Sequence, residues 1–189
     1  MVKRLRSTLA VCVGAAVAMA AGTTAANASP RFAEPTPAGT VVNLQLAGTD
    51  MCLDILGNPT ADANGAKAAQ WSCDGSDTQK WRMLPVDNSS FELRSVHSDK
   101  CLEIENSGTQ EGADAQIWAC SGGKQMRWQA SMVDPVKRLY EFRVTHTTER
   151  CLDISNSGFW NGVRTNGVRA QSWACNQSGA QLWQIKAVK

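Results

Sequence analysis

The sequence contains one four-residue motif three times, and the copies are almost evenly spaced. Cysteine, leucine, an acid and isoleucine follow one another at residues 52–55, 101–104 and 151–154, so the copies start 49 and 50 residues apart. A period of this length is typical of a supersecondary unit that buries a shared core only by packing against its neighbours. A chain of 189 residues then predicts one domain made of three repeats, at about 39–87, 88–137 and 138–189.

Each motif is followed by a second cysteine with a tryptophan two residues before it, and by another tryptophan eight residues after it. The variation in length therefore lies between the two cysteines of a repeat, as expected for a loop. The second cysteines are Cys73, Cys120 and Cys175, the tryptophans before them are Trp71, Trp118 and Trp173, and the later tryptophans are Trp81, Trp128 and Trp183.

Apolar and polar residues alternate along short segments at corresponding places in the repeats. The segments are 42–46, 91–94 and 140–144. Alternation with a period of two predicts half-buried strands, and no part of the chain after residue 28 shows an uninterrupted amphipathic helix pattern. The sequence therefore predicts an all-β fold in which three repeats close around one core and leave no exposed edge.

Residues 1–28 have the features of an export signal. Lys3, Arg4 and Arg6 precede an apolar run at 9–21, and Ala-Asn-Ala at 26–28 fits a cleavage site. The alternative is a membrane anchor, but the run is shorter than the roughly 20 residues that span a bilayer. We therefore expect a secreted, extracellular protein with no membrane association after signal removal. The Pro-rich residues 29–38 form a flexible lead-in to a domain at 39–189.

The charge and the cysteine count of the exported chain limit its partners. The whole chain carries 19 basic and 17 acidic residues, and without the signal these become 16 and 17, a net charge of −1. Electrostatic capture of nucleic acid is therefore not expected. Six cysteines remain in an oxidising compartment, which favours disulfides. The chain has no C-x-x-C motif and only 2 histidines, so we predict no metal and no other cofactor.

Two sets of disulfides fit a threefold repeat. Bonds within each repeat are the simplest set, and they would close loops of 21, 19 and 24 residues. Bonds between successive repeats, such as Cys73 to Cys101, are equally symmetric. Spacing alone does not decide between the two sets.

The two groups of tryptophans have different surroundings. Trp81, Trp128 and Trp183 lie in apolar strands and are expected in the core. The three tryptophans before the second cysteines are flanked by polar or small residues, so burial and a role as a ligand platform are equally compatible with their spacing. An exposed indole packs against the C–H face of a sugar ring, while carboxylates and amides bind hydroxyls.

Each repeat has one acid in its Cys-Leu-Asp/Glu-Ile motif, and this arrangement argues against an enzyme. Glycoside hydrolysis needs two carboxyl groups roughly 5 to 10 Å apart, whereas Asp54, Glu103 and Asp153 belong to different repeats. The nucleophile motif G-x-S-x-G and the zinc motif H-E-x-x-H are both absent from the sequence. We therefore expect a binding protein, not an enzyme.

The chain has three copies of Cys-Leu-Asp/Glu-Ile, three of Trp-x-Cys and two of Gln-x-Trp. The combination of these motifs resembles the ricin-type β-trefoil lectins. These lectins also occur as carbohydrate-binding modules of secreted bacterial proteins. The resemblance covers residues 39–189. It implies a β-trefoil, meaning a six-stranded barrel capped by three hairpins, with up to three shallow sugar sites. It also implies within-repeat disulfides, Cys52–Cys73, Cys101–Cys120 and Cys151–Cys175.

Carried over residue by residue, the resemblance implies an acid, an amide, a stacking tryptophan and a closing glutamine in each sugar site. The first repeat lacks the amide because Ala69 takes its place, and the second lacks the closing glutamine because Met126 does. The third repeat has all four and is expected to bind most strongly. The residues are Asp54, Trp71 and Gln79 in the first repeat, Glu103, Gln116 and Trp118 in the second, and Asp153, Gln171, Trp173 and Gln181 in the third.

The expected function is non-catalytic binding of a polysaccharide or glycan at several weak sites that gain by avidity. A β-trefoil that binds proteins through its loops, for example as a protease inhibitor, is the alternative. Phe159 and Trp160, in the longest loop of the third repeat, are candidates to extend a binding surface.

Overall fold

The computed structural model of the protein describes residues 39–188 apart from 58–59, 148, 156–158 and 161–162. The predicted signal peptide and lead-in lie outside the described residues, and the boundaries of the repeats stay predictions. Within the described part, every helical segment is a three-residue 3-10 turn, at Asp77–Gln79, Glu105–Ser107 and Lys124–Met126. None of the helices described there is long and apolar enough to cross a membrane.

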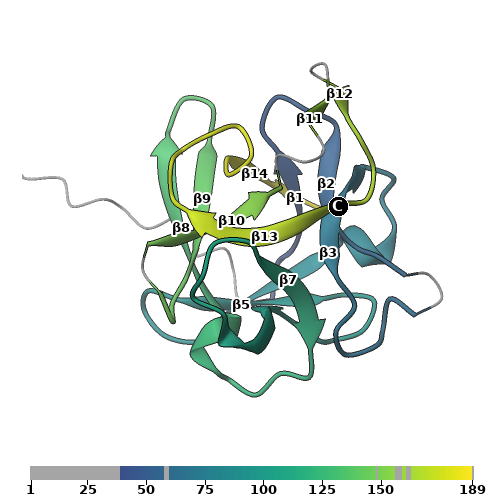
Figure 1. The fold of residues 1–189 in the computed structure, drawn as a ribbon, viewed down its shortest axis with the longest axis vertical. Coiled ribbons are helices and arrows are strands. Elements are labelled where there is room, and N and C mark those ends of the chain that lie inside the picture. The colour runs from purple at the N-terminus through teal and green to yellow at the C-terminus, as the bar shows by residue number, and fades with distance from the viewer. Residues whose placement is uncertain (1–38, 58–59, 148, 156–158, 161–162, 189) are drawn as a thin grey trace, which may run out of the picture.

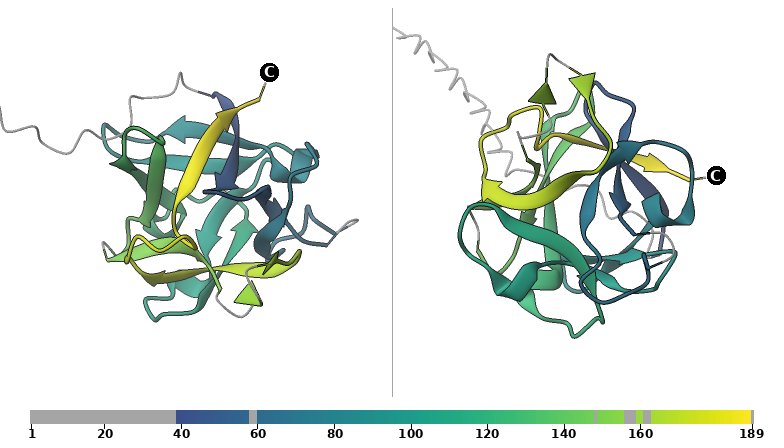
Figure 2. Two further views of the ribbon diagram at one scale, coloured as in Figure 1. Left: turned by 90° about the horizontal axis from the view of Figure 1, so that it is seen from above. Right: turned by 45° about the vertical axis from the view of Figure 1, so that its right-hand side comes forward.

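Six strands form a closed antiparallel barrel. Each strand pairs with the next, and the last pairs with the first, so the barrel has no free edge. In Figure 2, the left panel shows the last strand (yellow) running beside the first (dark blue). In order around the barrel the strands are β1 (Val41–Leu46), β4 (Trp81–Pro85), β5 (Phe91–Ser95), β8 (Arg127–Asp134), β9 (Leu139–Val144) and β14 (Trp183–Ala187).

Three hairpins, one from each repeat, meet at one end of the barrel (Figure 1). Strand β13 pairs with both β3 and β7, and a bridge between Lys67 and Gln116 joins the other two hairpins. The third repeat carries an additional small hairpin of β11 (Phe159–Trp160) and β12 (Val163–Arg164). The main hairpins are β2 (Met51–Ile55) with β3 (Ala68–Ser72), β6 (Cys101–Ile104) with β7 (Ala113–Trp118), and β10 (Arg150–Ile154) with β13 (Val168–Ala174).

The core lies inside the barrel and under the hairpins. Strand β1 shows the predicted alternation, because Val42, Leu44 and Leu46 are fully buried and the residues between them are not. Trp81, Trp128 and Trp183 are also fully buried, which confirms the prediction that they are core residues. Each indole N–H donates to the carbonyl of the leucine in its own repeat's Cys-Leu-Asp/Glu-Ile motif, at 3.0 to 3.2 Å, and so fastens the barrel to the hairpin.

Each repeat contains one disulfide. The bonds are Cys52–Cys73, Cys101–Cys120 and Cys151–Cys175, with sequence separations of 21, 19 and 24. Closing a loop of this length stabilises a fold by about 3 kcal/mol in the chain-entropy model. The architecture is a β-trefoil with within-repeat disulfides, as the family resemblance implied.

Candidate functional site

Each hairpin places an acid, the amide position and a tryptophan on one face. In the first hairpin Asp54 lies opposite Ala69, and Cys52 lies opposite Trp71. Residues opposite one another in an antiparallel pair share a face, and so do residues two apart along a strand. The register recurs in the other hairpins, with Glu103 opposite Gln116, Cys101 opposite Trp118, Asp153 opposite Gln171 and Cys151 opposite Trp173.

The three tryptophans on these hairpins are exposed. Trp71 has 38% of its surface exposed, Trp118 43% and Trp173 37%, whereas the three barrel tryptophans have none. Sequence spacing left burial and a platform role open, and the structure shows that these indoles are accessible to a ligand.

The acids beside the tryptophans are largely buried. Asp54, Glu103 and Asp153 have 5 to 6% of their surface exposed. A buried carboxylate needs hydrogen-bond donors, and the three repeats supply them differently. Two repeats use the amide on the opposite strand: Gln116 donates to Glu103 at 3.0 Å, and Gln171 donates to Asp153 Oδ1 at 2.8 Å.

The first repeat lacks that amide because it has Ala69. As a result, Asp54 Oδ1 is buried without a hydrogen-bond partner in the described structure. The only donor to the Asp54 carboxylate among the described residues is Gln79, whose amide donates to Oδ2 at 2.9 Å.

The closing glutamines tie each acid to the loop beyond the second cysteine. Gln79 and Gln181 are fully buried. Gln181 donates to Asp153 Oδ2 at 3.1 Å and to the Ala174 carbonyl at 2.8 Å, and its Oε1 accepts from the Asn176 N–H at 2.8 Å. Gln79 makes the same three kinds of bond. Because these amides are buried and fully used, their contribution to a site is to position the carboxylate.

The second repeat uses methionine for part of this role. Met126 is 1% exposed, and its sulfur accepts from the backbone N–H of Ser121 at 3.4 Å and from the Ser121 hydroxyl at 3.5 Å. A thioether accepts hydrogen bonds only weakly and donates none. Met126 therefore holds the loop but does not bind Glu103.

A turn from the preceding repeat supports each exposed indole. The N–H groups of Gly65, Gly112 and Gly167 donate at 2.9 Å to the carbonyl just before the tryptophan of the next repeat. A Cβ built on these glycines would lie 3.7 to 3.9 Å from Cζ3 of that tryptophan. The three glycines have φ between +82° and +87°, a backbone conformation that other residues rarely adopt. The partners are Gly65 with Trp118, Gly112 with Trp173, and Gly167 with Trp71.

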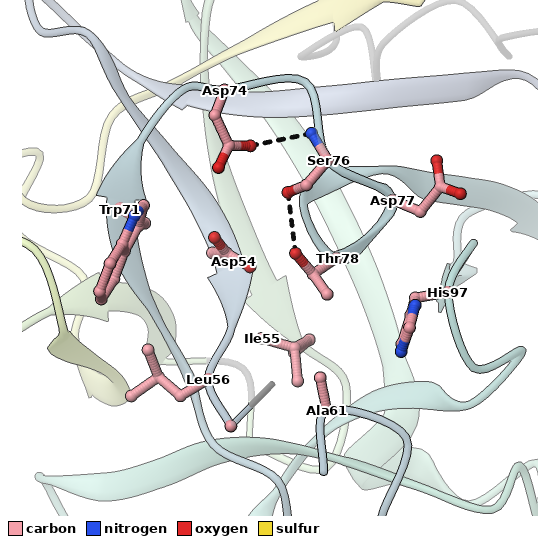
Figure 3. Close-up of a pocket in the computed structure, with 11 residues that line it drawn as sticks. Asp54, Ile55, Leu56, Ala61, Trp71, Asp74, Ser76, Asp77, Thr78 and His97 are labelled. Atoms are coloured by element: carbon pink, nitrogen blue, oxygen red, sulfur yellow. Dashed lines mark hydrogen bonds between the residues drawn. The ribbon is translucent and has the colours of Figure 1, made fainter. Parts of the chain in front are cut away.

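Two of these faces open into hollows in the surface. The hollow of the first repeat, which we call the first-repeat pocket, has a volume of about 510 Å³. In Figure 3, the Asp54 side chain lies between Trp71 on one side and Thr78 on the other. The second-repeat pocket, beside Glu103 and Trp118, has a volume of about 450 Å³.

Two further acids line the first-repeat pocket and remain ionised. Hydrogen bonds from the backbone N–H and then the side chain of Ser76 hold the pKa of Asp74 below its ordinary value. The side-chain hydrogen bond from Lys80, at 2.8 Å, and its positive charge lower the pKa of Asp77. Neither residue belongs to the repeated motifs, and the signal that distinguishes them is the variation at corresponding positions of the three repeats.

The structure thus groups the predicted residues into three sets, one on the hairpin of each repeat, and places each motif acid in a different set. The side chains of Phe159 and Trp160 lie outside the described residues, so their part in a binding surface stays a prediction.

Comparison with known proteins identifies the family. The model of the family described as ricin-type beta-trefoil lectin domain-like matches residues 26–118 and 84–164. The chain belongs to this family. No curated protein sequence matches it significantly.

Several solved structures share the fold of this ricin-type trefoil. The designed threefold symmetric protein ThreeFoil is 24% identical, with a TM-score of 0.69 over 78% of this chain and 99% of its own. The ricin B-like lectin of Macrolepiota procera, solved with lactose, is 17% identical, with a TM-score of 0.66 over 82% of this chain and 100% of its own.

A third structure with this fold is an exo-beta-1,3-galactanase from Clostridium thermocellum. It is 20% identical, with a TM-score of 0.70 over 82% of this chain, and the match spans 32% of the galactanase chain. At these identities the three likenesses show the fold alone.

Proposed function

We propose that this protein is a secreted, non-catalytic lectin that binds carbohydrate at up to three sites, one in each repeat. The observation that supports it best is the pairing, in every repeat, of an indole with 37 to 43% of its surface exposed and an oriented, nearly buried carboxylate on the same hairpin face. The indole offers an apolar surface for a sugar ring, and the carboxylate accepts hydrogen bonds from hydroxyls.

The proposal that the protein is not an enzyme is supported by the same geometry. Each motif acid receives its hydrogen bonds from side chains of its own repeat. Glycosidases need a carboxylic acid with a raised pKa beside a second carboxyl group. The pKa values of Asp74 and Asp77, which share the first-repeat pocket with Asp54, are instead lowered. The named relatives add that a lectin and part of a galactanase share this fold.

Secretion is supported by the three disulfides, since such bonds persist in oxidising compartments. Mass spectrometry of the protein recovered from the culture medium would test this. We expect a mature chain that begins at Ser29.

A glycan array with the purified protein tests carbohydrate binding. The matched comparison is the triple variant Trp71→Ala, Trp118→Ala and Trp173→Ala, with folding checked by its thermal unfolding transition. We expect the wild type to bind glycans, free sugar to compete, and the folded triple variant to lose binding. Retention of all glycan binding by the triple variant would contradict the proposed sites.

The array experiment also separates the lectin from a trefoil that binds proteins through its loops. A lectin is displaced from its target by soluble sugar, whereas a loop-mediated protein complex is not. If no glycan binds, and a protein partner binds that sugar does not displace, the protein-binding alternative is favoured.

A further inference from the structure

The first-repeat pocket differs in charge from the corresponding regions of the other two repeats. Three carboxylates line it: Asp54, Asp74 and Asp77. The second-repeat pocket has one acid, Glu103, in its lining. Within the described structure, no lysine or arginine lines the first-repeat pocket, and its one histidine, His97, lies on the side of Asp77, across the pocket from Trp71 (Figure 3).

This charge comes from the loop after the second cysteine, which has a different composition in each repeat. The residue directly after that cysteine is Asp74 in the first repeat, Ser121 in the second and Asn176 in the third. Three positions further on, the residues are Asp77, Lys124 and Gly179, listed in the same order. The backbone is alike in the first and third loops, since Asp74 and Asn176 each accept a hydrogen bond from the N–H two residues later. The difference between these loops at this position is therefore mainly one of charge.

Among the described residues, two of the three carboxylates have no cationic partner. Lys80 pairs with Asp77 at 2.8 Å. Arg169, which lies opposite Ala69 on the neighbouring strand, pairs with Asp114 of the second repeat at 2.5 Å. No ion pair in the described part of the chain involves Asp54 or Asp74.

The carboxylate of Asp54 also has an unused acceptor. The residue is 94% buried, having 6% of its surface exposed, and its Oδ1 has no hydrogen-bond partner among the described residues. That oxygen is itself buried, so in this structure it acts on the pocket through its uncompensated negative charge. Figure 3 shows this side chain at the centre of the pocket, with Trp71 beside it. In the third repeat, Gln171 occupies the equivalent oxygen of Asp153.

From this geometry we infer that the first-repeat pocket selects a sugar that carries a protonated amine, such as a glucosamine unit of a polysaccharide, an inference that rests on the carbohydrate binding proposed above. The ring packs on Trp71, and the ammonium group lies beside Asp54 and Asp74, while Asp77 adds negative charge at the edge of the pocket. An ammonium group satisfies buried or partly buried carboxylates through charge-assisted hydrogen bonds, and the face of an indole attracts it as well.

The arrangement of the acids fits an organic cation better than a metal ion. The side chains that bind a metal ion converge on one point. Among the described residues, only Glu92, Cys101 and Cys120 bring three possible ligand atoms within 4.8 Å of one another, and they lie outside the first-repeat pocket. The two cysteines of that group form a disulfide. The carboxylates of the first-repeat pocket are instead spread over a hollow of about 510 Å³, which is large enough for a sugar ring.

Isothermal titration with two matched probes tests the inference: a glucosamine oligomer and an N-acetylglucosamine oligomer of equal length. Acetylation removes the positive charge and keeps the ring. We expect the wild type to bind the charged oligomer at least about fivefold more tightly at low salt, the scale of one partly exposed ion pair. The preference should shrink at about 1 M salt, where the Debye length is about 3 Å.

Variants assign the preference to one site. Asp74→Asn copies the third repeat, keeps the acceptor for the Ser76 N–H, and should remove most of the preference without lowering thermal stability. Trp71→Ala should weaken binding of the charged oligomer more than Trp173→Ala does. Asp134→Asn, at the end of β8 and outside the pocket lining, should change nothing. Equal binding of the two oligomers, or an unchanged preference in Asp74→Asn, would overturn the inference.

A pentalysine peptide distinguishes a sugar site from a general cation-binding surface. If the peptide binds as tightly as the charged oligomer and Trp71→Ala leaves its binding intact, the selection of a sugar is wrong. If neutral glycans bind while the charged oligomer gains nothing, only the preference for an amine fails and the lectin function stands. If no sugar binds at all, both fail.

Discussion

The first and third repeats contain the same acid, indole and closing glutamine, yet they present different groups to a ligand. Asp153 has both carboxylate oxygens bound, one by Gln171 and one by Gln181. Asp54 has one oxygen bound, by Gln79, because Ala69 stands where the third repeat has glutamine. A repeated fold can therefore keep its architecture constant while single substitutions change which polar atoms remain for a ligand.

Removal of one disulfide should have the largest effect and should separate the two sites. Each disulfide joins the strand that carries the acid to the end of the strand that carries the tryptophan. For Cys151→Ala with Cys175→Ala, we expect a loss of about 3 kcal/mol of stability. That loss corresponds to a fall of about 6–12 °C in Tm. Differential scanning calorimetry measures this change.

The same double variant should lose binding of neutral sugar at the third repeat while the first repeat still binds. The double variant Cys52→Ala with Cys73→Ala should show the opposite pattern in titrations. Loss of both sites in either variant would mean that the repeats do not behave as separate binding units.

Truncation of the closing glutamines should have the next largest effect and should be worse in the first repeat. Gln79→Ala removes the described donor to Asp54, whereas Asp153 keeps Gln171 after Gln181→Ala. Hydrogen bonds to charged groups contribute about 1.5–3 kcal/mol, and buried groups left unpaired cost a similar amount. We expect a loss of about 3 kcal/mol for Gln79→Ala and about 2 kcal/mol for Gln181→Ala in denaturant unfolding. Equal losses would show that Gln171 does not support Asp153.

Exchange of the amide position should alter binding more than stability. Ala69→Gln gives the first repeat the amide of the third, and Gln171→Ala does the reverse. Ala69 lies opposite Arg169, so a glutamine there would have a basic residue as its neighbour. The second repeat already has this combination, because Gln116 accepts a hydrogen bond from Lys67 at 2.9 Å. One hydrogen bond is worth about 0.5–1.5 kcal/mol, so neutral-sugar affinity should rise at the first site and fall at the third by about two- to tenfold.

Titration of the single variants, each in a background that lacks the other exposed tryptophans, measures the two affinities. If the third site keeps its affinity after Gln171→Ala, the expectation that this site binds neutral sugar most strongly because of its amide is wrong.

Met126→Gln should have the smallest effect. It would give the second repeat the donor that the other two use to hold the acid, and we expect a gain of about 1 kcal/mol, or about 2–4 °C in Tm. Gln181→Met is the matched reverse variant and should lose a similar amount. A lower Tm for Met126→Gln would show that the longer side chain of Glu103 leaves no room for the amide.

Much of the fold could be predicted from the sequence because the repeat is exact where the fold needs it. In every repeat the motif leucine follows the first cysteine directly and the barrel tryptophan follows the second cysteine by eight residues. In the structure these residues form the disulfides and the Trp–Leu hydrogen bonds. Spacing did not reveal whether Trp71 and its two counterparts are exposed, because a polar neighbourhood in sequence is compatible with either face of a hairpin.

The details of the sites were harder to predict because they depend on contacts between side chains. Residue type made Gln79 and Gln181 candidates for sugar contact, and it did not indicate that both are fully buried and donate to the acids. The pocket acids Asp74 and Asp77 lie at positions that vary between repeats, so a search for what the repeats share passes over them. The contact of Gly167 with Trp71 joins residues of different repeats, which periodicity within one repeat does not reveal.

The contacts between glycine turns and indoles form a closed ring: first repeat to second, second to third, and third back to first. A ring of this kind has no beginning, so the position of the chain ends is independent of it. The first and last strands of the described domain are also neighbours, because Val42 of β1 pairs with Ala187 of β14. A circularly permuted domain, with these two strands joined by a linker and a new opening in the exposed turn at 135–138, would keep every link of the ring. Each repeat takes part in two of the three links, so a chain of only two of these repeats would keep one link and leave the ring open.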